Sequence, residues 1–339
     1  LQLKKITPSY RVFFHDWEQV DIYGDKEKDG QTLENIEKWA KKNFLSYLDK
    51  SSYQYNVWMK YCYRNYDSIF DFFTPEVMIQ WSKLRVFTKM RNYVRRFFKN
   101  SKVQKIMQYP LVFLWTSPFQ APALYNIMSH VDFNMGVFYP QWWIYQIVKT
   151  LQSIGEKHWV TYHTNAPITQ IIVDNKKASW VEFANDTKVY YDCVVCNADQ
   201  ARAETHLLPE KYQTYKKKYR QKKTFAPSWF MIYMWINKKI PQLTHHNLIF
   251  SEDWKENFKC IFWEDKQLPK DPSIYVCKSS ATDPSVAPEW KENMFILVPI
   301  PNDITISPKQ EKEYKQLVFD LVEQQCDCTF QDNIEYEKV

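Results

Sequence analysis

Glycine is the residue that this sequence most clearly lacks. The 339 residues contain only 4 glycines, whereas ordinary usage near 7% would give about 24. Turns that need a positive φ are normally made with glycine, so other residues must occupy many such positions. Tryptophan is abundant instead, with 14 residues. The scarcity of glycine excludes a collagen-like chain, and the 45% hydrophobic and 25% charged residues are typical of a globular protein.

Long apolar runs are also missing. No run approaches the roughly 18 residues that a spanning helix requires, and the first thirty residues carry no signal-peptide pattern. Any membrane contact is therefore expected to be peripheral. The 7 cysteines, an odd number, indicate reduced cytoplasmic thiols rather than a disulfide framework. A net charge of +6 is too balanced for a dedicated nucleic-acid surface, so no nucleic-acid partner is expected.

Motifs for hydrolytic, phosphate or metal chemistry are absent. The sequence has no GxSxG, HExxH or P-loop. Cys193 and Cys196 have CxxC spacing, but they end an extended run in which residues three apart point to opposite faces. His245 and His246 have no acidic partner pattern nearby and are expected to be hydrogen-bonded structural residues. We therefore expect no metal site.

Two stretches combine basic and aromatic residues. Residues 83–105 carry nine Lys or Arg and no acid, with Phe87, Met90, Val94 and Phe97 on one predicted helical stripe. This pattern is typical either of a helix on a membrane surface or of a domain helix whose stripe lies in the core. A second basic helix is predicted over 211–223. Another helix is predicted to begin at Pro75.

Periodicity predicts a mixed α/β protein. A hairpin is expected around residues 15–17, and three runs predict an antiparallel meander over 168–174, 179–183 and 188–196. Four further runs predict strands of a second sheet, at 228–236, 258–263, 273–280 and 293–300. Helices are predicted over 143–154 and 309–325.

Several long motifs resemble those of the bacterial phytoene desaturase family. They include PSYRVFFHDW (8–17), VFLWTSPFQAPALYNIMSHVDF (112–133), GVFYPQWWIYQIVKTL (136–151), VVCNAD (194–199), LTHHNLIF (243–250) and DPSIYVCKSSATDPSVAPEW (271–290). The resemblance runs from about residue 3 to about residue 338. It implies a partial FAD/NAD(P)-binding flavoprotein fold of the amine-oxidase and phytoene-desaturase type, with a substrate domain of antiparallel sheet and helices.

The resemblance also implies a division of the chain. Residues 1–31 would join the FAD and substrate domains, 32–135 would form a helical, membrane-facing region, 136–201 an FAD-domain helix and meander, 202–305 the substrate-domain sheet, and 306–339 a truncated C-terminal helical segment. By the same resemblance, residues near FAD would be Pro167, Ile168, Asn197, Ala198 and Asp199 in the meander, and Tyr139, Pro140, Trp142 and Trp143 in the YPQWW turn. No catalytic side chain is indicated.

The implied function is FAD-dependent desaturation of a phytoene-like polyene in carotenoid biosynthesis, at a membrane surface. A hydrocarbon offers no polar handle, so an apolar tunnel is expected to recognise it. Alternatives are a related carotenoid isomerase or retinoid saturase, or a non-catalytic fragment that binds lipid surfaces. The sequence does not indicate the oligomeric state.

The chain departs from the family in two ways. Tryptophan stands where the family has glycine, at Trp17, Trp115, Trp142, Trp143, Trp159, Trp180, Trp235 and Trp290, which indicates a gene that reads UGA as glycine. Trp39 and Trp254 are expected to be ordinary aromatic positions. The glycine-rich dinucleotide fingerprint is also missing, so we expect a fragment that binds FAD poorly and is inactive alone.

Overall fold

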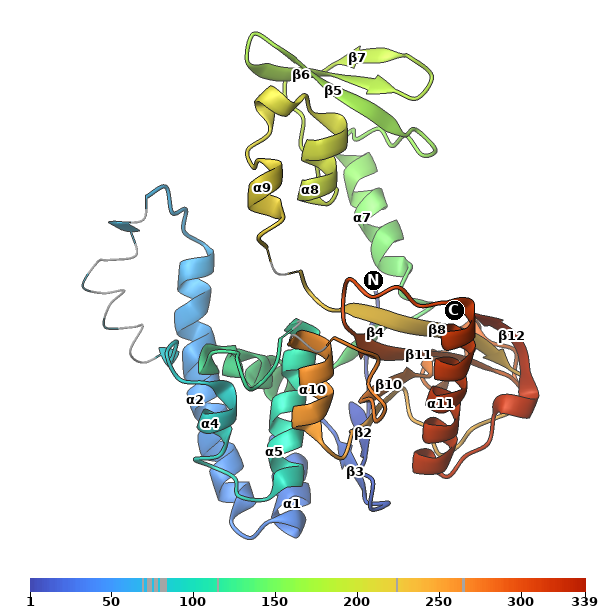
Figure 1. The fold of residues 1–339 in the computed structure, drawn as a ribbon. Helices are drawn as coiled ribbons and strands as arrows, with labels where there is room; N and C mark the ends of the chain where they lie inside the picture. Colours follow the sequence, from blue (N-terminus) through green and yellow to red (C-terminus); the bar gives the residue numbers. More distant parts are fainter. Residues whose placement is uncertain are drawn as a thin grey trace. The chain divides into compact units, whose positions relative to one another are not determined.

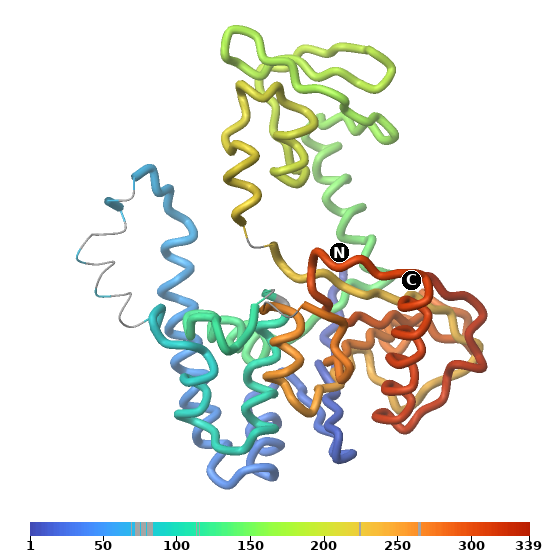
Figure 2. Tube along the Cα trace, viewed as in Figure 1, coloured from blue at the N-terminus to red at the C-terminus, as the bar shows by residue number. Residues whose placement is uncertain are grey.

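The computed structural model describes all residues except 69, 72–74, 76–78, 80–83, 115, 224, 264 and 265. It divides into two compact units, one of Leu1–Lys149 with Ala226–Val339 and one of Thr150–Phe225 (Figures 1 and 2). The mixed α/β class is confirmed. The helix predicted to begin at Pro75 falls largely outside the described residues. Within the described ranges, no helix combines the length and apolarity needed to cross a bilayer.

Unit 1 contains a seven-stranded sheet with the order β12-β8-β11-β10-β9-β2-β3. Neighbouring strands are antiparallel except β2 and β9, which pair in parallel. The predicted hairpin is confirmed as β2–β3, and three of the four predicted strands are confirmed as β8, β10 and β11. The strands are β2 (Tyr10–Phe13), β3 (Gln19–Ile22), β8 (Ser228–Ile236), β9 (His246–Ile249), β10 (Ile274–Cys277), β11 (Glu292–Ile300) and β12 (Ile334–Lys338).

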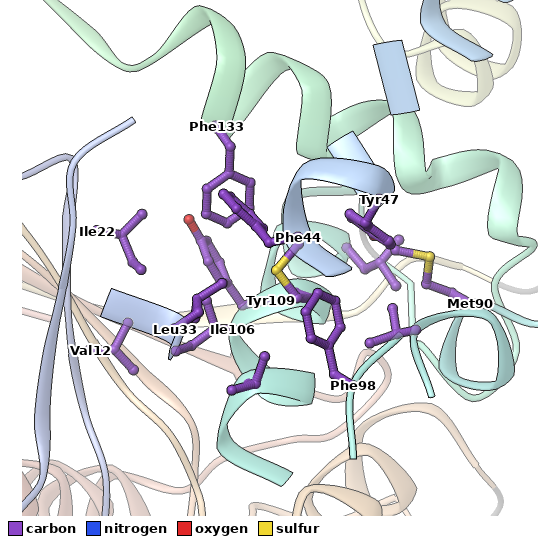
Figure 3. Packing of buried hydrophobic residues seen from close by; sticks show 14 of the residues in the cluster. Val12, Ile22, Leu33, Phe44, Tyr47, Met90, Phe98, Ile106, Tyr109 and Phe133 are labelled. Carbon is purple, nitrogen blue, oxygen red and sulfur yellow. The ribbon is translucent and has the colours of Figure 1, made fainter. Parts of the chain in front are cut away.

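Buried side chains lie on both faces of this sheet. Val12 belongs to one buried cluster and its neighbour Phe13 to the other, because successive side chains of a strand point to opposite faces. The first cluster packs against helices and is shown in Figure 3. These helices are α1 (Lys26–Ile36), α2 (Ala40–Cys62), α4 (Met90–Val94), α5 (Ser101–Gln108) and α10 (Trp254–Phe262). The second cluster includes Val318 and Val322 of α11 (Pro308–Cys326), which confirms the predicted C-terminal helix.

Shorter elements complete unit 1. Strand β1 (Leu3–Lys5) pairs with β4 (Phe138–Pro140) in a separate two-stranded sheet. The remaining helical segments are η2 (Tyr109–Leu114), η3 (Ala123–Asn126), α6 (Ile127–Ser129), η4 (His130–Met135), η7 (Ser279–Ala281), η8 (Pro284–Val286) and η9 (Gln331–Asn333).

The prediction of one basic helix over 83–105 is wrong. Helix α4 ends at Val94, and α5 begins at Ser101 after the side chain of Asn100 accepts a 2.8 Å hydrogen bond from the Lys102 backbone. An Asn in this N-cap position favours a new helix start over continuation. Met90 and Val94 are buried in the core, whereas Phe87 is 90% exposed. The apolar stripe therefore serves mainly as core rather than as a membrane-facing surface.

The strand predicted at 258–263 is also wrong, because this segment belongs to helix α10. Asp253 caps the helix, its side chain accepting hydrogen bonds from the backbone N–H groups of Lys255 and Glu256. Trp254, Phe258 and Ile261 recur at helical spacing and are buried. A short apolar run fits strand and helix equally well, and the cap decides between them.

Unit 2 contains the predicted meander, formed by β5 (Ile168–Asp174), β6 (Lys177–Phe183) and β7 (Lys188–Tyr190). The third strand ends before the predicted Cys196. Helix α7 (Gln146–Lys157) begins at the end of unit 1 and occupies most of the range predicted at 143–154. The basic helix predicted over 211–223 is wrong in extent, since only α9 (Lys217–Arg220) and η6 (Glu210–Tyr212) form there. The other segments are α8 (Gln200–Arg202) and η5 (Ala203–Leu207).

Among the tryptophans that the structure describes, five adopt the backbone conformation that favours glycine. Their φ values lie between 60° and 80°, and their side chains are 56–94% exposed. These residues are Trp17, Trp39, Trp142, Trp143 and Trp159. The interpretation of Trp39 as an ordinary aromatic position is therefore wrong, because its φ is 71° and it is 62% exposed. Trp254, by contrast, is 7% exposed in the core, as expected of a genuine aromatic.

Candidate active site

An apolar cavity of about 130 Å³ lies in unit 1 between the sheet and helix α10. The sheet provides alternating side chains that point toward the cavity, such as Leu248 and Tyr275, and α10 covers them with Trp254, Phe258 and Ile261. The remaining lining comes from Tyr109, Val112, Thr116, Pro227, Trp229, Ile249, Phe250, Asn257, Phe262, Ser273, Ile274, Leu297 and Pro299. Such walls bind a ligand by burying apolar area. The cavity can therefore hold a segment of a hydrocarbon chain.

A buried acidic group lies behind one wall of this cavity. The hydroxyl of Tyr109 donates a short hydrogen bond to Asp132, and Tyr10 packs edge-on against the Tyr109 ring at 5.2 Å. Burial, assisted by the charge of Asp29, raises the pKa of Asp132 to about 7. Burial also raises the pKa of Asp29 to about 6, although its carboxylate accepts the backbone N–H groups of Tyr23 and Asp25.

Sequence reasoning missed this acidic group. Asp29 and Asp132 are far apart in the chain, and neither belongs to a recognisable motif. The one local signal is Asp132 within the otherwise weakly polar run SHVDFNMG. An acid in such a run is usually exposed, so the run alone does not indicate a buried pair.

The YPQWW turn lies at the edge of a groove of about 1020 Å³ in unit 1. Trp142 and Trp143 line this groove together with Trp235, and Tyr139 and Pro140 end strand β4 beneath it. The backbone N–H of Trp143 donates a 2.8 Å hydrogen bond to Asp283. Burial disfavours charge on Asp283, but hydrogen bonds from Ser285 and the Trp143 backbone outweigh burial and hold the pKa of Asp283 below its usual value.

The predicted meander residues lie in unit 2. Ile168, Asn197 and Ala198 line one pocket of about 580 Å³. Pro167 accepts a backbone hydrogen bond from Ala184, and Asp199 caps α8 through a 2.8 Å bond from the Arg202 backbone. The structure thus brings three of the five predicted meander residues together in one pocket, whereas Pro167 acts as a hydrogen-bond acceptor through its carbonyl and Asp199 through its side chain.

The histidine pair at the start of β9 is held by hydroxyl groups. Nδ1 of His245 lies 2.7 Å from the Thr282 hydroxyl, and Nδ1 of His246 lies 2.6 Å from the Tyr275 hydroxyl. Burial lowers the pKa of His245 to about 4 and, with the neighbouring His245, that of His246 to about 3. Both imidazoles are therefore neutral near pH 7, and each uses its Nδ1 in one of these hydrogen bonds.

Comparison with known proteins gives consistent relatives. The chain is 38% identical over 338 residues to a carotenoid 3,4-desaturase of Haloarcula japonica, covering 99% of this chain and 68% of that protein. It is 31% identical to a zeta-carotene-forming phytoene desaturase of Myxococcus xanthus, covering 89% of this chain and 58% of that protein. No protein-family model matches the chain.

Solved structures share the fold at low identity. An oxidoreductase of Methanosarcina mazei aligns with a TM-score of 0.52 at 12% identity, covering 80% of this chain and 60% of that one. A Pyrococcus furiosus protein aligns with a TM-score of 0.57 at 11% identity, covering 99% of this chain and 68% of that one. These likenesses concern the fold alone.

Proposed function

Because the chain belongs to the carotenoid and phytoene desaturase family, we propose that it forms part of an enzyme that desaturates a phytoene-like polyene. Such an enzyme removes hydrogen across a carbon–carbon single bond and so extends the conjugation of its substrate. The observation that supports this most directly is the apolar cavity under α10, because a hydrocarbon is recognised through buried area rather than through polar contacts.

The residues of this chain would bind and orient the polyene. Phe258, Ile261 and Leu248 would hold a segment of it against the sheet and exclude water from the reacting bond. Hydrogen removal from carbon also releases a proton. Tyr109 lines the cavity and its hydroxyl donates to Asp132, so this buried pair offers a place to keep a proton without exposing the cavity to water.

FAD is the cofactor that we propose, since it accepts a hydride in reactions of this class. The described residues suit part of the FAD molecule. The unit 2 pocket offers apolar walls at Ile168 and Ala198 and an amide at Asn197, which suit an adenosine end. In unit 1, Trp142 and Trp143 line a separate groove and occupy glycine-like backbone positions, which would allow close approach of a cofactor or of the polyene if these residues were glycine.

The diphosphate of FAD has no matching site in this sequence. A dinucleotide cradle needs a glycine-rich turn that opens a helix, and the 4 glycines of this chain form no such motif. We therefore propose that polypeptide other than these 339 residues holds the diphosphate, and that this chain alone binds FAD weakly and is inactive.

The experiment joins a flavin spectrum to product analysis. The purified 339-residue chain and the natural gene product are each mixed with FAD and then given phytoene in liposomes. We expect flavin absorbance and coloured, more unsaturated products for the natural gene product alone. Products with an unchanged hydrogen count would indicate an isomerase, and vesicle binding without product a lipid-surface protein. Stoichiometric FAD on the 339-residue chain would contradict the proposed outside cradle.

A cavity-filling variant tests the site itself. Ile261→Phe extends a ring into the cavity and is expected to lower desaturation at least tenfold in the natural gene product. Ile240→Phe is the matched control, since Ile240 is equally buried in the second cluster but does not line the cavity. Overpacking costs about 1–3 kcal/mol at either place. Equal loss of activity in both variants would contradict the proposal that this cavity binds the substrate.

We also propose peripheral attachment to a membrane from which the polyene is drawn. Phe87 is exposed, as are five basic residues of the same segment, Arg85, Lys89, Arg95, Arg96 and Lys99. Each basic residue near an anionic surface contributes about 1 kcal/mol. In vesicle flotation, Arg95→Glu with Arg96→Glu should reduce binding to anionic vesicles. Lys309→Glu with Lys312→Glu on α11 makes the same charge change elsewhere and should leave binding intact. Equal reduction by both pairs would indicate a net-charge effect only.

A separate proposal concerns the gene, because this chain has tryptophan at positions where the family has glycine. We propose that UGA is read as glycine in the source organism and that many of these tryptophans are glycine in the natural protein. The positive φ of Trp17, Trp142, Trp143 and Trp159, together with their exposure, supports this. Trp39 joins the set on the same grounds. Peptide mass spectrometry of the natural protein is the test, and UGG codons at these positions would refute the proposal.

A further inference from the structure

The two central strands β9 and β10 bring three potential metal ligands together. They are His245, His246 and Cys277, and their candidate ligand atoms all lie within 4.8 Å of one another. His246 is paired with Cys277 in the antiparallel ladder, and the backbone N–H of Lys278 donates a 2.8 Å hydrogen bond to the carbonyl of His245. The backbone of the sheet thus fixes the cluster.

The hydrogen bonds of the two imidazoles leave one nitrogen of each ring available. His245 and His246 each use Nδ1, toward Thr282 and Tyr275 respectively. Among the described residues, neither Nε2 has a hydrogen-bond partner. A metal-bound histidine typically has its other ring nitrogen hydrogen-bonded, which fixes the tautomer and the ring orientation. Here the hydroxyls of Thr282 and Tyr275 occupy that position.

The surroundings suit a cation that prefers nitrogen and sulfur. His245 and Cys277 are 3% and 6% exposed, and the His245 and His246 rings lie 4.3 Å apart between Tyr139 and Tyr10. Asp283 lies close enough to His245 to act on it electrostatically, and its negative charge favours a cation. Zn²⁺ is bound by imidazole nitrogen and by Cys thiolate, and a site with three protein ligands leaves a fourth position for water.

We propose that His245, His246 and Cys277 form a binding site for a divalent cation of the Zn²⁺ type. Ligand atoms around tetrahedral Zn²⁺ stand about 3.5 Å apart, as metal–ligand lengths of about 2.0–2.3 Å require. The three ligands therefore close by roughly 1 Å on binding, through side-chain rotation on a rigid ladder. Cys277 gives up its proton to solvent as the metal–sulfur bond forms. The site needs neither flavin nor polyene, so it stands apart from the proposed desaturase activity.

The test uses Co²⁺ as a spectroscopic substitute for Zn²⁺. The full chain carries Cys193→Ser and Cys196→Ser, which remove the exposed cysteine pair, and is stripped with a chelator. We expect one Co²⁺ per chain, a thiolate-to-cobalt charge-transfer band, and displacement by Zn²⁺. Cys277→Ser should abolish the band, and His245→Gln should weaken binding at least tenfold.

The matched control is Cys260→Ser, because Cys260 is equally buried in α10 and, among the residues that the structure describes, belongs to no group of three potential ligands. This variant should keep both the band and the stoichiometry. If Cys277→Ser fails to fold, X-ray absorption of the Zn²⁺-loaded parent decides, since one sulfur and at least two nitrogens are expected in its first shell. Absence of stoichiometric binding, or a band that persists in Cys277→Ser, would overturn the site.

Discussion

At several single residues, the backbone conformation does not suit the side chain that the sequence gives. Positive φ is tolerated by Asn and Asp, and Asn165, Asn175, Asp186, Asp303 and Asp327 use it here. Tryptophan has no such tolerance, because its Cβ meets the following carbonyl at a cost of about 1–2 kcal/mol. An exposed indole gains little packing to offset this. Tryptophan at a position that requires positive φ therefore destabilises the folded protein.

Replacing such a tryptophan by glycine should stabilise the protein. Trp17→Gly, at the β2–β3 turn, is expected to raise the free energy of unfolding by about 1 kcal/mol because it removes the Cβ strain. Trp254→Gly is the contrasting variant, and loss of its buried ring should lower the same quantity by about 3–5 kcal/mol. Urea unfolding measures both. A destabilised Trp17→Gly protein would show that the indole is native to that turn.

The buried acid Asp132 should make stability depend on pH. Its folded pKa of about 7 lies above the unfolded value of 3.8, so the folded state holds the extra proton and stability falls as pH rises between about 4 and 7. Asp132→Asn should remove a slope of up to one proton in that window, while Asp29 retains a smaller slope. Unfolding at several pH values measures this. An unchanged slope would place the titration on another group.

Secondary-structure elements depend on caps as much as on periodicity. Strands β5, β6, β8, β10 and β11 were predictable because alternation or sustained β-branched and aromatic runs mark them. Helix α10 was not, because its apolar run is too short to reveal a period of 3.6. The decisive signal was Asp253 with Glu256 three residues later, a helix-start pattern. Asn100 gave a similar signal within the basic segment.

Removal of the α10 cap should weaken the helix that covers the cavity. Asp253→Ala leaves two backbone N–H groups without their side-chain acceptor and is expected to lower the free energy of unfolding by about 1 kcal/mol. Lys255→Ala, in the same exposed turn, should stay within about 0.5 kcal/mol of the parent. Chemical denaturation compares the two. Equal effects would mean that the cap contributes nothing.

At the scale of the whole molecule, the two units differ in how many of their residues are buried. Unit 1 holds two large buried clusters, whereas the buried residues described in unit 2 are Ile171, Ser179, Val181, Ala203 and Glu204. Regions with few buried contacts open more readily. We expect amides of β6 to exchange with solvent at least tenfold faster than those of β11 in the isolated chain. Equal protection in hydrogen-exchange mass spectrometry would contradict this.

The candidate site was predictable only where it follows local motifs. The family resemblance implied that Ile168, Asn197 and Ala198 lie near one another, and the structure brings them to one pocket. Pairing across the whole chain could not be foreseen, because nothing local connects Tyr109 with Asp132 or His246 with Cys277. The first contact joins two helical segments, η2 and η4, and the second depends on strand order in the sheet; periodicity specifies neither.

The parallel pairing of β2 with β9 has a consequence for synthesis. Arg11 and Asn247 are neighbours in the sheet, so the β2–β3 hairpin waits for its partner strand until β9 has left the ribosome. Unit 2 lies wholly within that interval and relies on nearby segments, which form contacts sooner. Nascent chains arrested before residue 246 should therefore leave residues 10–22 open to protease, and chains arrested well beyond it should protect them.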